Sequence, residues 1–171
     1  VTTRSRGSGG ILGGLRRMLA SESFFLSTYR TTDGQPGHVG LAPVQMGDVF
    51  RVDMDGSVPW LCAGGSYLGS AATIDVDSRF QGVKGFFSGE SLSFVRLTGA
   101  GPFLVSAFGS SVEVEVKDGL DTGHVVAYEE TLDYTPGKLG GSWIQSFLAG
   151  EGVVLHFSGR GRLLVQSHNP Q

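Results

Sequence analysis

Apolar and polar residues alternate along much of this chain. The alternation is clearest from residue 49 to 54, from 73 to 77 and from 112 to 116. Similar short runs begin at Phe24 and cover residues 91–97, 155–157 and 163–165. Because successive side chains of a strand point to opposite faces, each run predicts a strand with one buried face. Short strands at such spacing indicate an all-β fold, a sandwich or a barrel.

Turn-forming residues separate these runs. Aspartate–glycine, glycine–aspartate and proline–glycine pairs stand at residues 33–34, 47–48, 55–56, 118–119 and 136–137. Helical spacing of apolar residues occurs only at 11–19 and around 143–148, and Gly13 and Gly14 weaken the first of these segments. We therefore expect at most short helical turns.

Two stretches of the chain resemble each other. Residues 90–106 and 151–167 each contain a glutamate, an alternating strand, a Gly-x-Gly pair, a second apolar strand and a serine. A weaker copy begins at Glu22, and residues 65–69 are echoed by 123–127. Two-residue hairpins need positive φ, so Gly99, Gly101, Gly159 and Gly161 are predicted to form hairpin corners. The pattern predicts tandem β units of about sixty residues.

The predicted organisation has four parts. Residues 1–21 form a basic, glycine-rich arm, 22–85 a first β unit, 86–145 a second unit, and 146–171 the C-terminal hairpin of a third unit.

Composition narrows the classes of protein. The chain has 171 residues, of which 28 are glycine and 6 are proline, without the three-residue period of collagen. A hydrophobic share of 40% with 17% charged residues excludes a disordered chain. The net charge of −3 argues against general nucleic-acid binding. A single cysteine, Cys62, excludes an internal disulfide; we interpret it as a small buried residue and predict a reducing, cytoplasmic location.

The arm is the best candidate for a binding site. It holds Arg4, Arg6, Arg16 and Arg17, and no acidic residue precedes Glu22. These arginines could contact a neighbouring subunit, with Leu12, Leu15 and Leu19 buried at the interface, or bind an anionic membrane surface. Nucleic acid is disfavoured, because the remaining chain is acidic.

No pattern predicts catalysis. The four histidines, His38, His124, His156 and His168, lack the spacing of metal ligands, and Glu22, Glu90 and Glu151 occupy equivalent repeat positions that would not converge on one substrate. No serine lies in a nucleophile elbow, and the glycine-rich arm lacks the lysine of a phosphate-binding loop. We predict no catalytic residue, no cofactor and no metal.

Several segments together resemble one family. They are residues 9–19, 22–25, 46–49, 89–92, 97–101, 121–128, 150–154 and 165–170. In this order the chain resembles the TRAP-like family related to the mitochondrial biogenesis protein "altered inheritance of mitochondria" and its bacterial homologues. The resemblance implies three TRAP-like units, each a short, jelly-roll-like double-stranded β-helix, and a homotrimer whose nine units close a ring. Family members carry further residues before the arm, so the first unit is expected to be incomplete.

The first hypothesis is therefore a non-enzymatic assembly protein of uncharacterised function, a trimeric ring that acts as a scaffold or interaction platform. The alternative is a module that binds an anionic membrane or a protein partner through the arm. The third hypothesis is a ligand- or metal-binding jelly-roll enzyme.

Overall fold

The described part of the protein consists of β-strands and their connections. The computed structural model describes residues 2–4, 26–77, 94–136 and 154–168, and these ranges contain no helix. The predicted all-β class is confirmed, while the two expected helical turns lie outside these ranges. The strands are β1 (Thr2–Arg4), β2 (Leu26–Thr28), β3 (Val49–Asp55), β4 (Trp60–Ala63), β5 (Tyr67–Ser70), β6 (Ile74–Asp77), β7 (Phe94–Ser106), β8 (Ser111–Val116), β9 (Leu120–Thr122), β10 (Val125–Glu129), β11 (Leu132–Pro136), β12 (Leu155–Gly159) and β13 (Gly161–Gln166).

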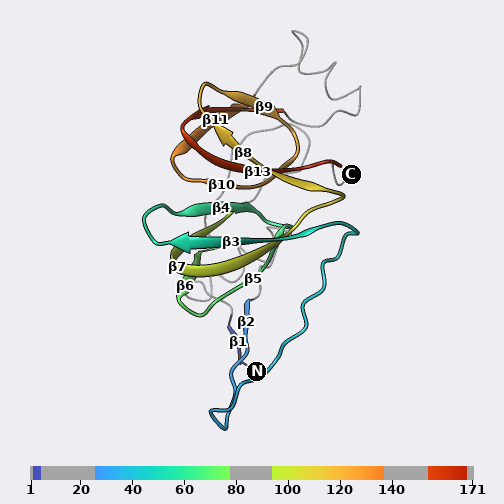
Figure 1. Ribbon diagram of the computed structural model, residues 1–171, viewed down its shortest axis with the longest axis vertical. Coiled ribbons are helices and arrows are strands. Elements are labelled where there is room, and N and C mark those ends of the chain that lie inside the picture. The colour runs from blue at the N-terminus through green and yellow to red at the C-terminus, as the bar shows by residue number, and fades with distance from the viewer. Residues whose placement is uncertain (1, 5–25, 78–93, 137–153, 169–171) are drawn as a thin grey trace, which may run out of the picture.

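The strand pairs of the described ranges are all antiparallel and fall into three groups. The largest has the order β3-β7-β4-β10-β13-β8, with β5 and β6 also paired to β7. A three-stranded sheet has the order β11-β12-β9, and β1 pairs with β2. Figure 1 shows two curled layers, one built from β3 to β7 and one from β8 to β13, which meet where β4 lies beside β10. We call these layers the first half (49–106) and the second half (111–166).

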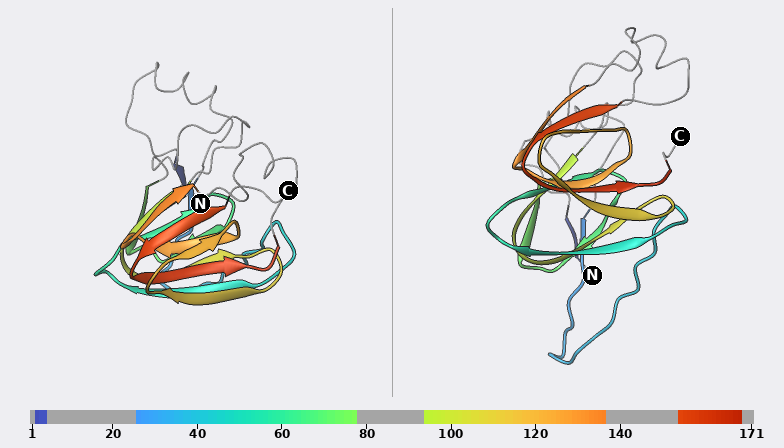
Figure 2. Two further views of the ribbon diagram at one scale, coloured as in Figure 1. Left: turned by 90° about the horizontal axis from the view of Figure 1, so that it is seen from above. Right: turned by 45° about the horizontal axis from the view of Figure 1, so that its top comes forward.

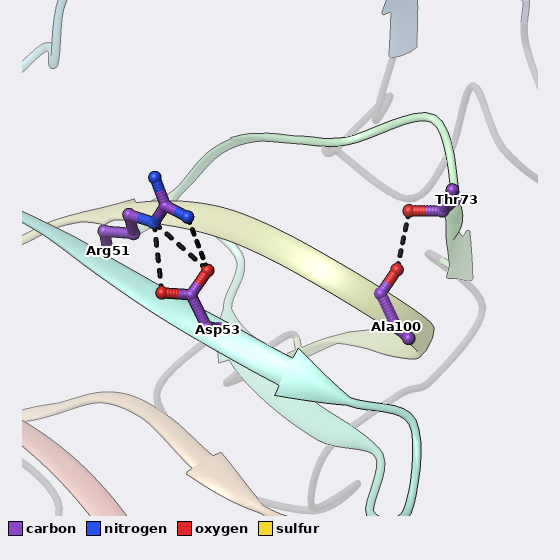
Figure 3. A network of polar contacts seen from close by, with 4 residues as sticks. All are labelled: Arg51, Asp53, Thr73 and Ala100. Carbon is purple, nitrogen blue, oxygen red and sulfur yellow. Dashed lines mark hydrogen bonds and ion pairs between the residues drawn. The ribbon is translucent and has the colours of Figure 1, made fainter.

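Strand β7 bends at its two glycines and pairs with different strands before and after the bend. Its first part pairs with β4 and β6, and its second part with β3 and β5. Gly99 has φ of 112° and Gly101 of 138°. A β-carbon on Gly99 would lie 2.4 Å from the carbonyl oxygen of Thr73, so only glycine lets β6 approach here. The Thr73 hydroxyl donates to the Ala100 carbonyl at 2.6 Å and holds the bend (Figure 3).

The second half bends in the same way. Gly159 has φ of 100°, and a β-carbon there would lie 2.9 Å from the carbonyl oxygen of Thr131. A β-carbon on Gly161 would lie 2.4 Å from the Thr131 hydroxyl. The prediction of hairpin corners was wrong, because β7 continues through its glycines and β12 leads into β13 without pairing to it. These glycines carry a strand from one sheet to the next.

The pairings of the first half correspond to those of the second half. Strands β3 and β5 pair with the second part of β7 as β8 and β10 pair with β13. Strands β4 and β6 pair with the first part of β7 as β9 and β11 pair with β12. The register shift in β5, between Tyr67 and Gly69, recurs in β10 between Val125 and Ala127. Residues of β5 and β10 correspond at a distance of 58, and residues of β4 and β9 at a distance of 60.

Two apolar cores lie on opposite faces of the run β6-β7-β4-β10-β13-β8. One core includes Trp60 and Cys62 of β4 and packs against β3; the other includes Leu61 of β4 and packs against β12. Because β4 and β10 lie between both cores, their residues are buried on both faces. This explains why neither strand shows the alternation that revealed β3, β6 and β8 in the sequence.

A long exposed connection separates β2 from β3. Leu26 of β2 packs against the first core, whereas Tyr29, Val44 and Met46 are exposed. In Figure 1 this connection runs away from the body and returns along its side to β3. Figure 2 shows the same stacking of the halves from two further directions. All three predicted unit boundaries, after residues 21, 85 and 145, lie outside the described residues.

Candidate functional site

The two halves of the described fold meet where β4 pairs with β10. Three residue pairs form this junction: Trp60 with Glu129, Leu61 with Tyr128, and Cys62 with Ala127. It is a strand-to-strand junction between segments that are far apart in the sequence, and it makes one sheet out of two halves (Figure 1). We call it the seam.

An arginine–glutamate pair bridges the seam from half to half. Arg96 stands opposite Leu61 on the neighbouring strand, and its guanidinium donates to both carboxylate oxygens of Glu130, at 2.7 and 2.6 Å. The hydrogen bonds to Glu130 are the main cause that raises the pKa of Arg96. Because two hydrogen bonds join the guanidinium to the carboxylate, the contact fixes the relative orientation of the two groups. The pair therefore fixes how the halves sit against each other.

A second arginine, Arg162 of β13, contacts the seam from the second half. The Arg162 side chain donates to one carboxylate oxygen of Glu129 at 2.7 Å, and the Arg162 backbone amide donates to the other at 2.9 Å. Its guanidinium carbon lies 4.9 Å from the centre of the Trp60 ring, which is 1% exposed. The cation–π contact joins β13 of the second half to β4 of the first.

Not every ion pair in the protein connects the halves. Arg51 and Asp53 lie on the exposed face of one strand, β3, and Figure 3 shows them side by side there. The hydrogen bond from Arg51 is the largest cause that lowers the pKa of Asp53. Both groups are open to water, so this pair contributes little to stability. It provides a natural comparison for the pairs at the seam.

Parts of two segments that carried the family resemblance, residues 47–48 and 167, meet residues 109–111 at a crossing of the chain. Gly47 pairs with Gly109 in a parallel bridge, and a β-carbon on Gly47 would lie 2.1 Å from the Ala107 carbonyl oxygen. The Asp48 carboxylate accepts the Ser111 amide at 2.9 Å. Further on, the Ser167 hydroxyl accepts the Ser110 amide at 3.0 Å, and the amide of Ser167 donates to the Ser110 carbonyl at 2.9 Å. The crossing thus joins the start of β3, the connection between β7 and β8, and the end of β13.

The second core contains a buried aromatic cluster. Tyr128 makes edge contacts with Phe94 and Phe157, at ring distances of 5.4 and 5.1 Å. Its hydroxyl is fully buried without a hydrogen-bond partner among the described residues. Burial, and after it the neighbouring Tyr134, raises the pKa of Tyr128. The cluster packs the core beneath the seam, and the buried Tyr128 hydroxyl is a cost to the fold.

The histidines do not converge on a common site. His38 lies in the exposed connection before β3, and the ring of His168 packs near Phe108 at 5.2 Å. His156 of β12 bonds Asp121 of the neighbouring β9 at 2.6 Å, and Thr135 stands opposite it on β11. The side chains of His156 and Asp121 are 50% and 67% exposed. Among the described residues this row lies on an exposed face of the sheet β11-β12-β9.

Among the described residues, no three histidine, cysteine, aspartate or glutamate side chains are placed to hold a metal ion together. Cys62 is fully buried, and burial raises the pKa of its thiol, as expected for the small core residue that the sequence predicted. The same described ranges contain no helix with the length and hydropathy to span a bilayer.

Sequence reasoning and structure select different residues. Of the predicted contact residues, Arg4 lies in β1, where only the backbone is described, and Arg6, Arg16 and Arg17 lie outside the described residues. The seam residues were missed, namely Trp60, Arg96, Glu129, Glu130 and Arg162. The adjacent acids at 129–130, placed directly after a wholly apolar strand, are the sequence signal that could have drawn attention to them.

Comparison with known proteins shows which family the chain belongs to. It is 32% identical over 179 residues to an uncharacterized protein of Streptococcus pyogenes serotype M6, across 99% of this chain and 71% of that protein. It is also similar to the crystal structure of a Streptococcus pyogenes protein from a structural genomics consortium, with a TM-score of 0.68, 25% identity, and coverage of 98% of this chain and 76% of the other. The family model described as mitochondrial biogenesis AIM24 matches residues 1–168. The chain therefore belongs to the AIM24 family.

Proposed function

We propose that this protein is a non-enzymatic assembly protein, a homotrimeric ring of TRAP-like units that serves as a scaffold or interaction platform. The seam carries the proposal. It shows how one half of this chain adds to the next through paired strand edges, which is the way a ring of similar units grows. The correspondence of the pairings in the two halves supports the interpretation that they are copies of one unit.

Unpaired strand edges favour association. Strand edges expose amide and carbonyl groups that are satisfied by another strand or by water. Within the described ranges β5 pairs only with β7, and β9 pairs only with β12. A second copy of the chain that paired with β5 or β9 would extend these sheets. The buried Cys62 thiol fits a reducing, cytoplasmic location for such an assembly.

The oligomeric state tests this proposal. Light scattering coupled to gel filtration, and sedimentation equilibrium, should give a mass three times the chain mass of 18.0 kDa at micromolar concentration. A stable monomer under these conditions would overturn the proposal.

A second function has one specific observation in its favour. Four arginines precede Glu22 without any acidic residue, whereas the residues after them carry more acidic than basic groups. Such an arm suits an anionic membrane surface. Vesicles with anionic lipid should then float with the protein, and replacing Arg16 and Arg17 by glutamine should abolish flotation. The matched control replaces the exposed Arg30 and Arg160; equal flotation of both variants would remove the arm from the mechanism.

A further inference from the structure

Aspartate–glycine pairs are chemically labile, and they occur in this chain at residues 33–34, 55–56 and 118–119. The amide nitrogen that follows an aspartate can attack the side-chain carboxyl, and glycine hinders this attack least because it has no β-carbon. All three pairs are exposed, so access to water does not distinguish them. They differ in how firmly the fold holds each aspartate and the backbone beside it.

We propose that Asp33–Gly34, in the connection between β2 and β3, is a site of spontaneous modification at which the folded protein converts aspartate to isoaspartate. The amide nitrogen of Gly34 loses its proton and bonds to Cγ of Asp33, while the carboxyl hydroxyl leaves as water. One water molecule then opens the resulting five-membered succinimide. Opening at the main-chain carbonyl of Asp33 gives isoaspartate, and opening at Cγ returns aspartate. Water is the only co-reactant.

The backbone at Asp33 and Gly34 has room to rotate. Neither residue belongs to a strand, and Figure 1 shows their connection running away from the body. Gly34 has φ of 71°, and a β-carbon there would meet no atom within 4 Å. The Asp33 carboxylate accepts the amide of Gln35 at 3.1 Å, within the same exposed turn. Ring closure here breaks no sheet contact, so it needs only a local opening of low free energy.

Asp55 is held more firmly. It is the last residue of β3 and pairs with Ala100 of β7. One of its carboxylate oxygens accepts the amide of Ser57 at 2.8 Å and the Ser57 hydroxyl at 2.6 Å. The hydroxyl bond is the main cause that lowers the pKa of Asp55. Because water leaves from the neutral carboxyl, both the two hydrogen bonds and the lowered pKa oppose cyclisation.

Asp118 lies in a short turn between two paired strands. β8 ends at Val116 and β9 begins at Leu120, and these strands are paired to β13 and β12. Gly119 has φ of 128°, and a β-carbon there would lie 3.4 Å from the ring of His156. Rotation of the backbone at Asp118 would therefore disturb the pairing of both strands.

Conversion at residue 33 should leave the protein folded. Isoaspartate adds one carbon atom to the main chain, and the pair lies outside both cores and outside the described strands. The connection would then present a free α-carboxylate. Methyltransferases that use S-adenosylmethionine esterify this group in isoaspartyl proteins, so it is the chemistry by which such an enzyme would recognise the aged chain.

Peptide mapping of aged protein tests the site. The intact protein is kept at about pH 6 and about 37 °C for several weeks, and is then digested with an endoproteinase that cuts before aspartate but not before isoaspartate. We expect isoaspartate to form at residue 33 about fivefold or more faster than at residues 55 and 118. In guanidinium chloride, where the fold no longer restrains them, the three pairs should convert at rates within about threefold of one another.

Methyl transfer gives an independent measurement. Aged protein should accept labelled methyl groups from S-adenosylmethionine when an isoaspartyl methyltransferase is added. Asp33→Glu should lose most of this acceptance, because glutamate closes the corresponding six-membered ring far more slowly. Asp118→Glu is the matched control and should accept as much as the unchanged protein. Equal rates at the three pairs in the folded protein, or undiminished methyl acceptance in Asp33→Glu, would overturn the proposal.

Discussion

Arg96 of β7 and Glu130, which directly follows β10, hold the two halves together through two hydrogen bonds of 2.7 and 2.6 Å. The two residues come from opposite sides of the seam, 34 positions apart in the chain. A side chain of the first half thus locks a strand of the second, and the pairing of β4 with β10 is fixed by more than its backbone bonds.

Removing this pair should destabilise the protein measurably. The side chains of Arg96 and Glu130 are 36% and 30% exposed, so the charges are only partly screened. Arg96→Ala leaves a half-buried carboxylate without its partner, and we expect the free energy of unfolding in urea to fall by about 1–2 kcal/mol. Arg51→Ala is the matched control, because its pair with Asp53 is open to water, and its effect should stay below about 0.5 kcal/mol. Equal losses in both variants would contradict the role assigned to Arg96.

Gly99→Ala should be among the most damaging small substitutions. It combines a positive φ of 112° with a β-carbon 2.4 Å from the backbone carbonyl of Thr73, which has no rotamer to move away. We expect a loss of about 2–4 kcal/mol, measured by chemical unfolding. Gly65→Ala is the control, since a β-carbon there meets nothing within 4 Å, and its effect should lie within about 1 kcal/mol. A tolerated Gly99→Ala would show that β6 does not approach β7 as closely as described.

Tyr128→Phe should stabilise the protein. The substitution keeps the ring contacts of the aromatic cluster and removes a buried hydroxyl that has no partner among the described residues. Relief from this desolvation is expected to raise the free energy of unfolding by about 1 kcal/mol. The control is Tyr29→Phe, because the Tyr29 side chain is exposed and should change little. A loss of stability in Tyr128→Phe would mean that the hydroxyl has an interaction in solution.

Stability should fall at alkaline pH. Burial raises the pKa of Cys62 above its ordinary value of 9.0 and the pKa of Tyr128 above 10.0. Below about pH 8 both groups are neutral in the folded and unfolded chain, so their contribution is complete. As pH rises through 9 and 10 the unfolded chain ionises while the folded protein does not, and the free energy of unfolding declines. Tyr128→Phe should reduce this decline above pH 10, and an unchanged pH profile would contradict its cause.

The Cys62 thiol should resist modification in the folded protein. It is fully enclosed between the halves, and only the thiolate is an effective nucleophile. At pH 8 a maleimide reagent should label it in denaturant but leave it unlabelled under native conditions. The variant Ser110→Cys, with its thiol on an exposed connection, should react at once and serve as the control. Rapid native labelling of Cys62 would show that the seam opens.

Much of the strand content could be predicted, because β3 and β6 each have one buried and one exposed face, and β8 buries Val116 although Val112 is exposed. Their alternation follows directly from that arrangement. The sequence did not predict β4 and β10, because they lie between two cores. A strand buried on both faces shows no alternation of apolar and polar residues. The seam could not be predicted either, because these two strands form it. Its charged residues, Arg96 and Glu130, acquire meaning only when distant strands pair.

The sequence by itself determined the all-β class, the buried cysteine and the resemblance between two stretches near sixty residues apart, because these depend on local alternation, composition and spacing. The tertiary structure decided what the Gly-x-Gly pairs do. Whether such a pair closes a hairpin or bends a continuing strand depends on what approaches it. Here the carbonyl oxygens of Thr73 and Thr131, in the turns before β6 and β11, lie close to Gly99 and Gly159. It also decided that β4 meets β10, since strand edges are matched across space by register, and no local pattern encodes that match.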